Sequence, residues 1–335
     1  MILQKFKLDF QWPHFEPFLF CVHHNDLYPA GNTEQGIDKN ILASRNLGQD
    51  FELKDGFRMY HGKIIPGFPV HPHRGFETIT IVRKGYIDHA DSMGAAGRYG
   101  QGDVQWMTAG SGVQHSEMFP LLQSTEKNPV ELFQIWLNLP KKNKMADPHF
   151  TMFWNEKIPI FKSEQDGCEV SVISGFYKNV MSLNPPPDSW ASDPKNEVKI
   201  LLVKLPKNKI FELEKSVNTV QRAIYFFNGS KIKMNRTEID SKTGILVDAQ
   251  IDLEITAVDD FCEILVLQSA TMNEPVVQHG PFVMNSKEEI SKTIQDYQKT
   301  QFGGWAWPRT DMTHGSKIER FAKYPDGRIE KPSSV

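Results

Sequence analysis

Short strand-like segments separated by turn residues constrain the fold of this 335-residue chain more than any other feature. In the first half they lie at 76–85, 102–110 and 131–139, and the turn-rich stretch 97–103 precedes one of them. Further segments follow at 168–176, 198–205, 222–229 and 261–268. Turns spaced about ten residues apart favour a β-sandwich or barrel over alternating strands and helices. We therefore predict an all-β protein.

The length of the chain predicts about two domains. Apolar alternation gives way to Lys, Pro and Asn at 139–148, so we place a boundary there and expect domains at 1–148 and 149–335. One helix is predicted at about 287–300, because Ser286 and Glu289 have the spacing of a capping box before an apolar stripe. We expect this short C-terminal helix, which falls within the second domain, to dock one face on a barrel as a surface cover.

Composition narrows the range of partners. A formal net charge of −3 provides no field that would steer the chain to nucleic acid or to anionic lipid. No apolar run reaches the ~18 residues of a membrane span, so we expect no membrane partner. The cysteines Cys21, Cys168 and Cys262 lack CxxC spacing, and reduced thiols are typical of intracellular proteins. We expect a cytoplasmic protein, with a nuclear location left open.

Two short clusters carry side chains that bind metals, His71-Pro72-His73 and His115-Ser116-Glu117. Residues two apart on a β-strand point to the same face, so two such strands side by side could present three imidazoles and one carboxylate to a single point. Nitrogen and oxygen ligands suit Fe, Mn, Co, Ni, Cu or Zn. Pro72 has no N–H, which suits an edge strand or a bulge.

The distribution of histidine assigns this site to the first half of the chain. Nine of the eleven histidines lie within residues 1–149, and none lies between 150 and 278. If both halves are barrels, only the first can hold a histidine-rich metal site. His89, His61 and the pair His23-His24 have no comparable neighbours in the sequence, so we predict no role for them.

The sequence resembles the pirin family of the cupin superfamily. The resemblance depends on five strings: HPHRGFET at 71–78, GDVQWMTAG at 102–110, HSEM at 115–118, ELFQIWLNLP at 131–140 and QHGPFVMN at 278–285. It implies two tandem cupin barrels, with iron (Fe²⁺ or Fe³⁺) in the N-terminal barrel and no metal motif in the second. It also implies that His71, His73, His115 and Glu117 are the iron ligands.

Further residues of the predicted site follow from this resemblance. Many cupins use a Glu in the first motif as a ligand, which is Glu77 here, whereas pirin-like proteins use the Glu117 position. Glu77 has the same strand phase as His71 and His73, so we predict that it lies in the second shell of the metal. Glu117 is the predicted general base. Phe76 and Met107 are predicted to line an apolar substrate pocket.

The resemblance leaves two functions open. Some pirin-like proteins are quercetin 2,3-dioxygenases, which implies a flavonol and O₂ as substrates of an iron-dependent oxygenase. Others are non-enzymatic, redox-sensing transcriptional co-regulators that bind protein partners. We favour the enzyme over the regulator. A cupin sugar isomerase or a storage protein is disfavoured, because no Lys-rich clamp for a sugar phosphate stands beside the site.

Overall fold

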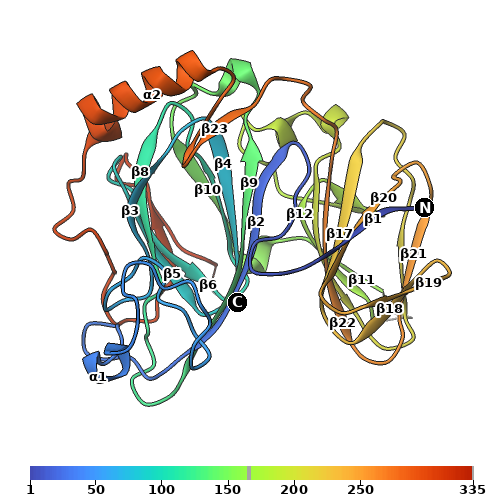
Figure 1. Cartoon of the computed structure of the whole chain (residues 1–335), viewed down its shortest axis with the longest axis horizontal. Helices are drawn as coiled ribbons and strands as arrows, with labels where there is room; N and C mark the ends of the chain where they lie inside the picture. The colour runs from blue at the N-terminus through green and yellow to red at the C-terminus, as the bar shows by residue number, and fades with distance from the viewer. Residues whose placement is uncertain (164–166, 334–335) are drawn as a thin grey trace. The chain divides into compact units, whose positions relative to one another are not determined.

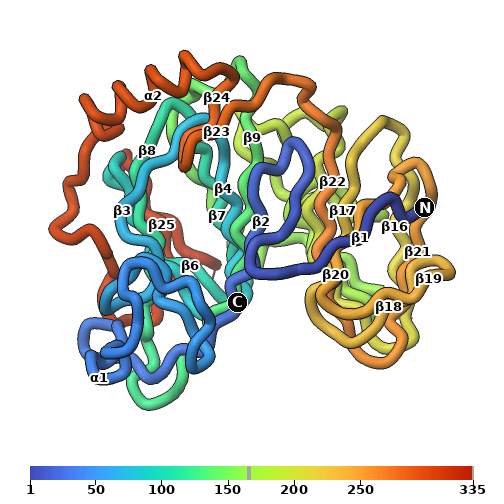
Figure 2. The backbone as a smooth tube through the Cα atoms, in the orientation of Figure 1, coloured from blue at the N-terminus to red at the C-terminus, as the bar shows by residue number. Residues whose placement is uncertain are grey.

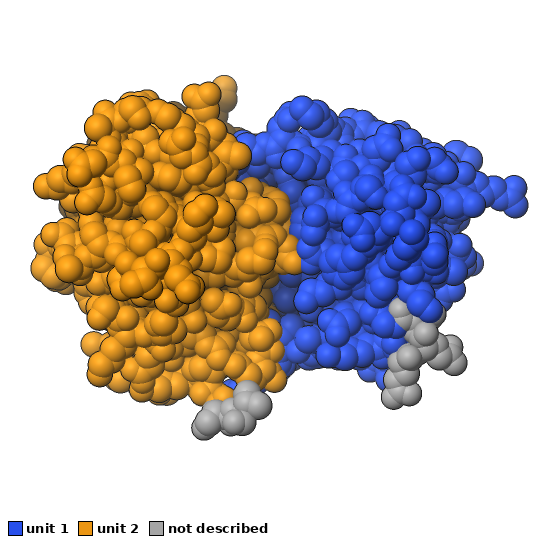
Figure 3. Space-filling model, turned by 90° about the horizontal axis from the view of Figure 1, so that it is seen from below, with its two compact units in different colours: residues 1–22, 135–140, 157–273 blue, residues 23–134, 141–156, 274–335 orange. Residues whose placement is uncertain are grey.

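A computed structural model describes residues 1–163 and 167–333 (Figure 1). The chain forms two compact units (Figure 3). Unit 1 contains residues 1–22, 135–140 and 157–273, and unit 2 contains residues 23–134, 141–156 and 274–335. The N-terminal residues 1–22 group with most of the second half of the chain, and the C-terminal helix and tail group with most of the first half. The units are therefore not the continuous domains expected from the sequence. The boundary between residues 148 and 149 stays a prediction for the two family domains.

Unit 1 is built from two antiparallel sheets and a hairpin. The seven-stranded sheet has the order β1 (Ile2–Lys7), β20 (Thr243–Val247), β17 (Gln221–Asn228), β22 (Cys262–Ser269), β15 (Lys199–Leu205), β12 (Glu169–Ser174) and β11 (Ile160–Lys162). The four-stranded sheet has the order β16 (Ile210–Leu213), β21 (Leu253–Ala257), β18 (Lys231–Met234) and β19 (Thr237–Asp240). The hairpin is β13 (Phe176–Tyr177) and β14 (Val180–Met181). The strands predicted from the second half of the sequence are therefore confirmed.

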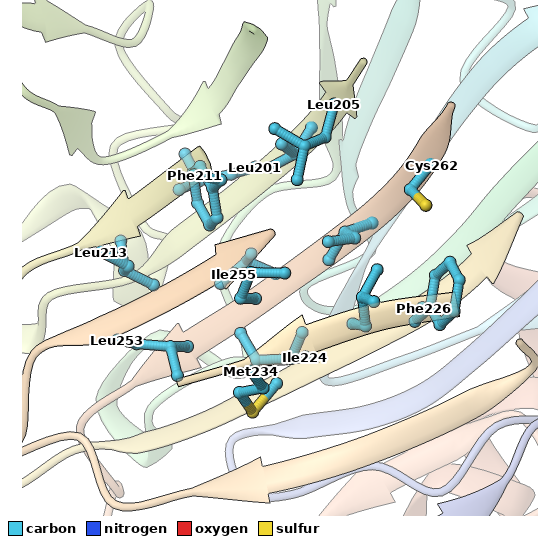
Figure 4. Packing of buried hydrophobic residues seen from close by; sticks show 14 of the residues in the cluster. Leu201, Leu205, Phe211, Leu213, Ile224, Phe226, Met234, Leu253, Ile255 and Cys262 are labelled. Atoms are coloured by element: carbon cyan, nitrogen blue, oxygen red, sulfur yellow. The ribbon is translucent and has the colours of Figure 1, made fainter. Parts of the chain in front are cut away.

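Apolar side chains from both sheets of unit 1 meet in one core (Figure 4). Leu201 and Ile224 come from the seven-stranded sheet, and Phe211 and Ile255 come from the four-stranded sheet. Alternation explains this packing, since buried and exposed residues alternate along β16, as they do in a strand with one face on a core. Cys21, Cys168 and Cys262 are buried free thiols.

Unit 2 is also built from two antiparallel sheets. The five-stranded sheet has the order β10 (His149–Phe153), β7 (Val104–Thr108), β4 (Phe76–Lys84), β9 (Asn128–Asn138) and β2 (Phe18–Tyr28), the last two extending into the residues of unit 1. The six-stranded sheet has the order β26 (Ile329–Glu330), β25 (Phe321–Lys323), β6 (Ala96–Gly100), β5 (Tyr86–Asp91), β8 (Val113–Met118) and β3 (Gly67–His73). The all-β prediction is confirmed, and β3 is an edge strand, as Pro72 indicated.

The predicted C-terminal helix is α2 (Lys287–Thr300), and the capping box of Ser286 and Glu289 is formed at its start. A hairpin of β23 (Val277–His279) and β24 (Phe282–Met284) precedes it. The other helical segments are α1 (Lys39–Leu42) and five 3₁₀ turns: η1 (Lys141–Asn143), η2 (Asn155–Lys157), η3 (Trp190–Ser192), η4 (Pro194–Asn196) and η5 (Gln301–Gly303). No helix among residues 1–163 and 167–333 combines the length and apolarity needed to cross a membrane.

Candidate metal centre

Three of the predicted ligands come together where β3 and β8 lie side by side (Figure 2). His71 stands directly opposite His115 in the antiparallel register, and His73 lies two residues farther along β3. One ring nitrogen from each of these three histidines lies within 4.8 Å of the other two. A shift of register between Phe68 and His71 marks a bulge, and bulges often redirect side chains next to functional sites.

The three rings form a compact triangle, defined as the histidine triad. The ring centroids are 4.5 Å apart for His71 and His115, 4.8 Å apart for His71 and His73, and 4.9 Å apart for His73 and His115. Nδ1 of His71 lies 2.8 Å from the carbonyl oxygen of Pro69. That bond orients the ring and leaves Nε2 available for a metal ion.

Burial keeps the triad in the form that binds metals. It lowers the pKa of His71 to about 4, and it holds the pKa values of His73 and His115 well below the ordinary histidine range. At neutral pH all three imidazoles are therefore uncharged, with a lone pair for a metal ion. Both ring nitrogens of His115 are buried and have no hydrogen-bond partner within the described residues. Since buried polar atoms are almost always satisfied, this donor set fits a metal ion.

Glu117 lies beside the triad, with Oε2 3.8 Å from Nε2 of His115. Its oxygens accept hydrogen bonds from Thr80 Oγ1 at 3.1 Å, from Gln134 Nε2 at 2.8 Å and, more weakly, from the hydroxyl of Tyr99 at 3.5 Å. Burial raises the pKa of Glu117, and these hydrogen bonds oppose that shift. The carboxyl group is thus held in place next to the histidines. Its role as the fourth ligand stays a prediction.

Glu77 has a different environment. Its Oε1 accepts a hydrogen bond of 2.8 Å from Oγ1 of Thr108, its cross-strand neighbour on β7. Thr80, three residues later on β4, donates to Glu117 and therefore points to the opposite face from Glu77. The strand phase shared with His71 does not carry over, because Gly75 takes a positive φ of 87° between β3 and β4. Glu77 therefore faces away from Glu117, and its predicted second-shell role has no support from the strand geometry.

Phe76 and Met107 are both buried, with 0% and 1% of their surfaces exposed. The ring of Phe76 lies 5.1 Å from the ring of His73. Met107 is paired with Thr78, two residues before Thr80, so it shares the face of the sheet that points to Glu117. Their role as the lining of a substrate pocket stays a prediction.

Comparison with known proteins identifies the family. The Pirin domain matches residues 32–137, and the Pirin C-terminal cupin domain matches residues 200–303. A pirin-like protein of Caulobacter vibrioides is 33% identical over 71% of this chain and 81% of its own length. The chain belongs to the pirin family. The predicted family and the predicted pair of cupin domains are thus confirmed.

Other members of the pirin family, and a solved structure, link this fold to an enzyme name. A Pseudomonas aeruginosa protein provisionally named quercetin 2,3-dioxygenase is 34% identical over 70% of this chain and 79% of its own length. The crystal structure of quercetin 2,3-dioxygenase from Acinetobacter baumannii has a TM-score of 0.71 and 25% identity, and covers 90% of this chain and 98% of that one.

His89, for which the sequence predicted no role, is fully buried on β5 opposite Glu117. Its ring lies 5.6 Å from the ring of His115, and its Nε2 is 3.2 Å from Oδ2 of Asp91. The strand that contains His89 could pair with the strand that contains His115, and that possibility could be seen in the sequence. Which strands pair is specified by no residue type, so the sequence did not place His89 beside the triad.

Proposed function

We propose that this member of the pirin family is an iron-dependent oxygenase of the quercetin 2,3-dioxygenase type, with His71, His73, His115 and Glu117 as the iron ligands. The observation that carries the proposal is the triad of uncharged imidazoles, with His71 half-buried and His73 and His115 buried, in which one nitrogen from each ring lies within 4.8 Å of the others. The names of the Pseudomonas and Acinetobacter relatives support the choice of reaction.

When bound, the metal would supply Lewis-acid and redox chemistry toward a flavonol and O₂. The substrate would be the flavonol, and each turnover would consume one O₂ and release one CO and one ring-opened ester. Glu117 would take the proton of the flavonol 3-hydroxyl, because its buried carboxylate has a raised pKa and hence a higher affinity for a proton. Thr80 and Gln134 would hold the carboxylate in place for that transfer.

Aromatic side chains beside the triad support the proposal of a flat aromatic ligand. Phe68 is half-buried, and its ring lies 6.3 Å from that of His71 and 6.1 Å from that of Phe119. Phe76 packs against His73 from the five-stranded sheet. Apolar walls with a few polar groups are typical of pockets for small aromatic molecules.

The test is single-turnover chemistry. The purified protein is loaded anaerobically with Fe(II), its iron content is measured, and quercetin and O₂ are then added while CO is followed. We expect one CO for each flavonol consumed by the native protein and none from His115→Ala. Fully loaded protein that releases no CO would refute the dioxygenase and would favour the non-enzymatic alternative. Parallel loading with Mn(II), Co(II), Ni(II), Cu(II) and Zn(II) identifies the metal that supports turnover.

A further inference from the structure

A segment from the far end of the chain packs over the two turns next to the triad. This segment, residues 281–304, contains β24, α2 and η5, and we call it the C-terminal strap (Figure 1). Its contact begins at the backbone of Arg74, the residue that follows His73. The N–H of Arg74 donates to the carbonyl of Pro281 at 3.3 Å, and the N–H of Val283 donates to the carbonyl of Arg74 at 3.0 Å.

The side chain of Arg74 reaches into α2. Its Nη1 donates to Oδ2 of Asp296 at 2.9 Å and to Oγ1 of Thr293 at 3.3 Å, and its guanidinium lies 4.4 Å from the ring centroid of Phe302. Its Nε donates to the carbonyl of Ser111 at 2.7 Å. Arg74 is 6% exposed, whereas the side chain of Asp296 is 37% exposed, so the guanidinium is buried and its carboxylate partner lies at the surface.

A second set of bonds reaches the other ligand strand. Gln114 immediately precedes His115 on β8. Its Nε2 donates to the carbonyls of Gln301 at 2.8 Å and Gly304 at 3.1 Å, and its Oε1 accepts a hydrogen bond of 2.9 Å from the hydroxyl of Tyr297. The strap therefore bonds to the direct sequence neighbour of one histidine on each ligand strand.

The strap also packs closely against the two turns beside the triad, at Gly75 and at Gly112. A Cβ atom on Gly75 would lie 2.0 Å from the carbonyl oxygen of Val283, and a Cβ on Gly112 would lie 2.7 Å from the ring of Phe302. The Nζ of Lys144 also bridges the carbonyls of Gly75 at 2.7 Å and Val283 at 3.1 Å. The turns that flank the triad cannot shift without moving the strap.

We infer that the C-terminal strap positions the ligand strands of the metal centre, and that Asp296 and Tyr297 are positioning residues that act through Arg74 and Gln114. β3 is an edge strand with a bulge, and away from β8 its Val70 N–H donates to the carbonyl of Thr310 at 2.8 Å. The strap adds a restraint at the end of β3 that carries His73. Partners beyond the direct ligands commonly change metal affinity by about 10–100-fold. The inference rests on the metal centre of the proposed function and not on its substrate.

The experiment measures metal binding without flavonol or O₂. Asp296→Asn removes the carboxylate charge that faces Arg74, and Tyr297→Phe removes the hydroxyl that binds Gln114. Co(II) affinity is measured by competition with a chelator, and the geometry of the bound ion is followed by visible absorption. We expect each variant to bind Co(II) about 10-fold more weakly, the double variant to bind more weakly still, and the absorption bands to shift. Asp296→Glu, which keeps the charge, should restore most of the affinity.

Two further variants separate positioning from general stability. Lys292→Gln changes an exposed residue of α2 and should leave affinity and spectrum as in the native protein. Ser286→Ala removes the helix cap, so it destabilises α2 without touching Arg74 or Gln114. An equal loss of affinity in Ser286→Ala and Asp296→Asn at matched thermal stability would overturn the inference, as would native affinity in the double variant. If the metal affinities change as expected but the native protein releases no CO, the result would count against the dioxygenase and leave the positioning role in place.

Discussion

His71 and His115 face each other directly across the β3–β8 ladder, with ring centroids 4.5 Å apart. Residue 73, by contrast, is paired with Val113, so the third imidazole has no ligand opposite it. The triad thus consists of one cross-strand pair and one residue farther along β3. Removing His115 takes away the only triad member on β8, and therefore the convergence of the two strands on one point.

We expect His115→Ala to lose metal. The variant keeps two imidazoles on a single strand, so its affinity for Co(II) or Fe(II) should fall at least about 10-fold, the range seen when weaker outer contacts are removed. Elemental analysis after loading and gel filtration measures the bound metal. The matched control is His279→Ala, at an exposed histidine, which should retain native stoichiometry. Equal metal content in both variants would contradict the triad as the binding site.

Glu117→Gln and Glu77→Gln form a second matched pair. Both glutamates are buried, but only Glu117 lies beside the triad. We expect Glu117→Gln to weaken metal binding about 10-fold or more, because an amide is a poorer ligand than a carboxylate. Glu77→Gln should leave metal affinity within about threefold of native, since its hydrogen bond is to Thr108. Isothermal titration with Co(II) measures the affinity of each variant. A larger loss of affinity in Glu77→Gln than in Glu117→Gln would indicate that Glu77 is the carboxylate close to the metal.

The stability of the metal-free protein should fall as the pH is lowered. Burial lowers the pKa of His71 from 6.5 to about 4, so the unfolded chain binds more protons than the folded protein between these values. The free energy of unfolding therefore decreases from about pH 6.5 to pH 4, with a contribution from His71 on the order of 3 kcal/mol. Urea unfolding at several pH values measures it. His71→Gln should have a shallower pH dependence than native protein, and His279→Gln should not; identical slopes would contradict the lowered pKa of His71.

A change in the core of unit 1 should affect stability and leave the metal content unchanged. Leu201 is fully buried in the core between the two sheets of unit 1, so Leu201→Ala should lower the free energy of unfolding by about 2–5 kcal/mol. Leu3 is 62% exposed, and Leu3→Ala should change it by less than about 0.5 kcal/mol. Denaturant unfolding and elemental analysis check both expectations. Loss of metal in folded Leu201→Ala would show that the site depends on unit 1.

Local features of the sequence predicted much of the structure. The strands at β4, β7 and β17 follow from apolar runs bounded by turns, and α2 follows from its capping box and apolar stripe. These features depend on neighbours within a few residues, where backbone geometry and side-chain periodicity act directly. The two H-x-H and H-x-E pairs were visible for the same reason, because a spacing of two places both side chains on one strand face.

The sequence alone determined the family, the all-β class, the C-terminal helix and the residue types that could bind a metal. The tertiary structure decided which strands pair, and hence that His89 stands opposite Glu117 and that Glu77 points away from Thr80's face. It also decided that α2 belongs to unit 2, where Asp296 meets Arg74 across 222 residues of chain. Such contacts depend on long-range packing, which no local pattern encodes, because many pairings of the same strands bury their apolar faces equally well.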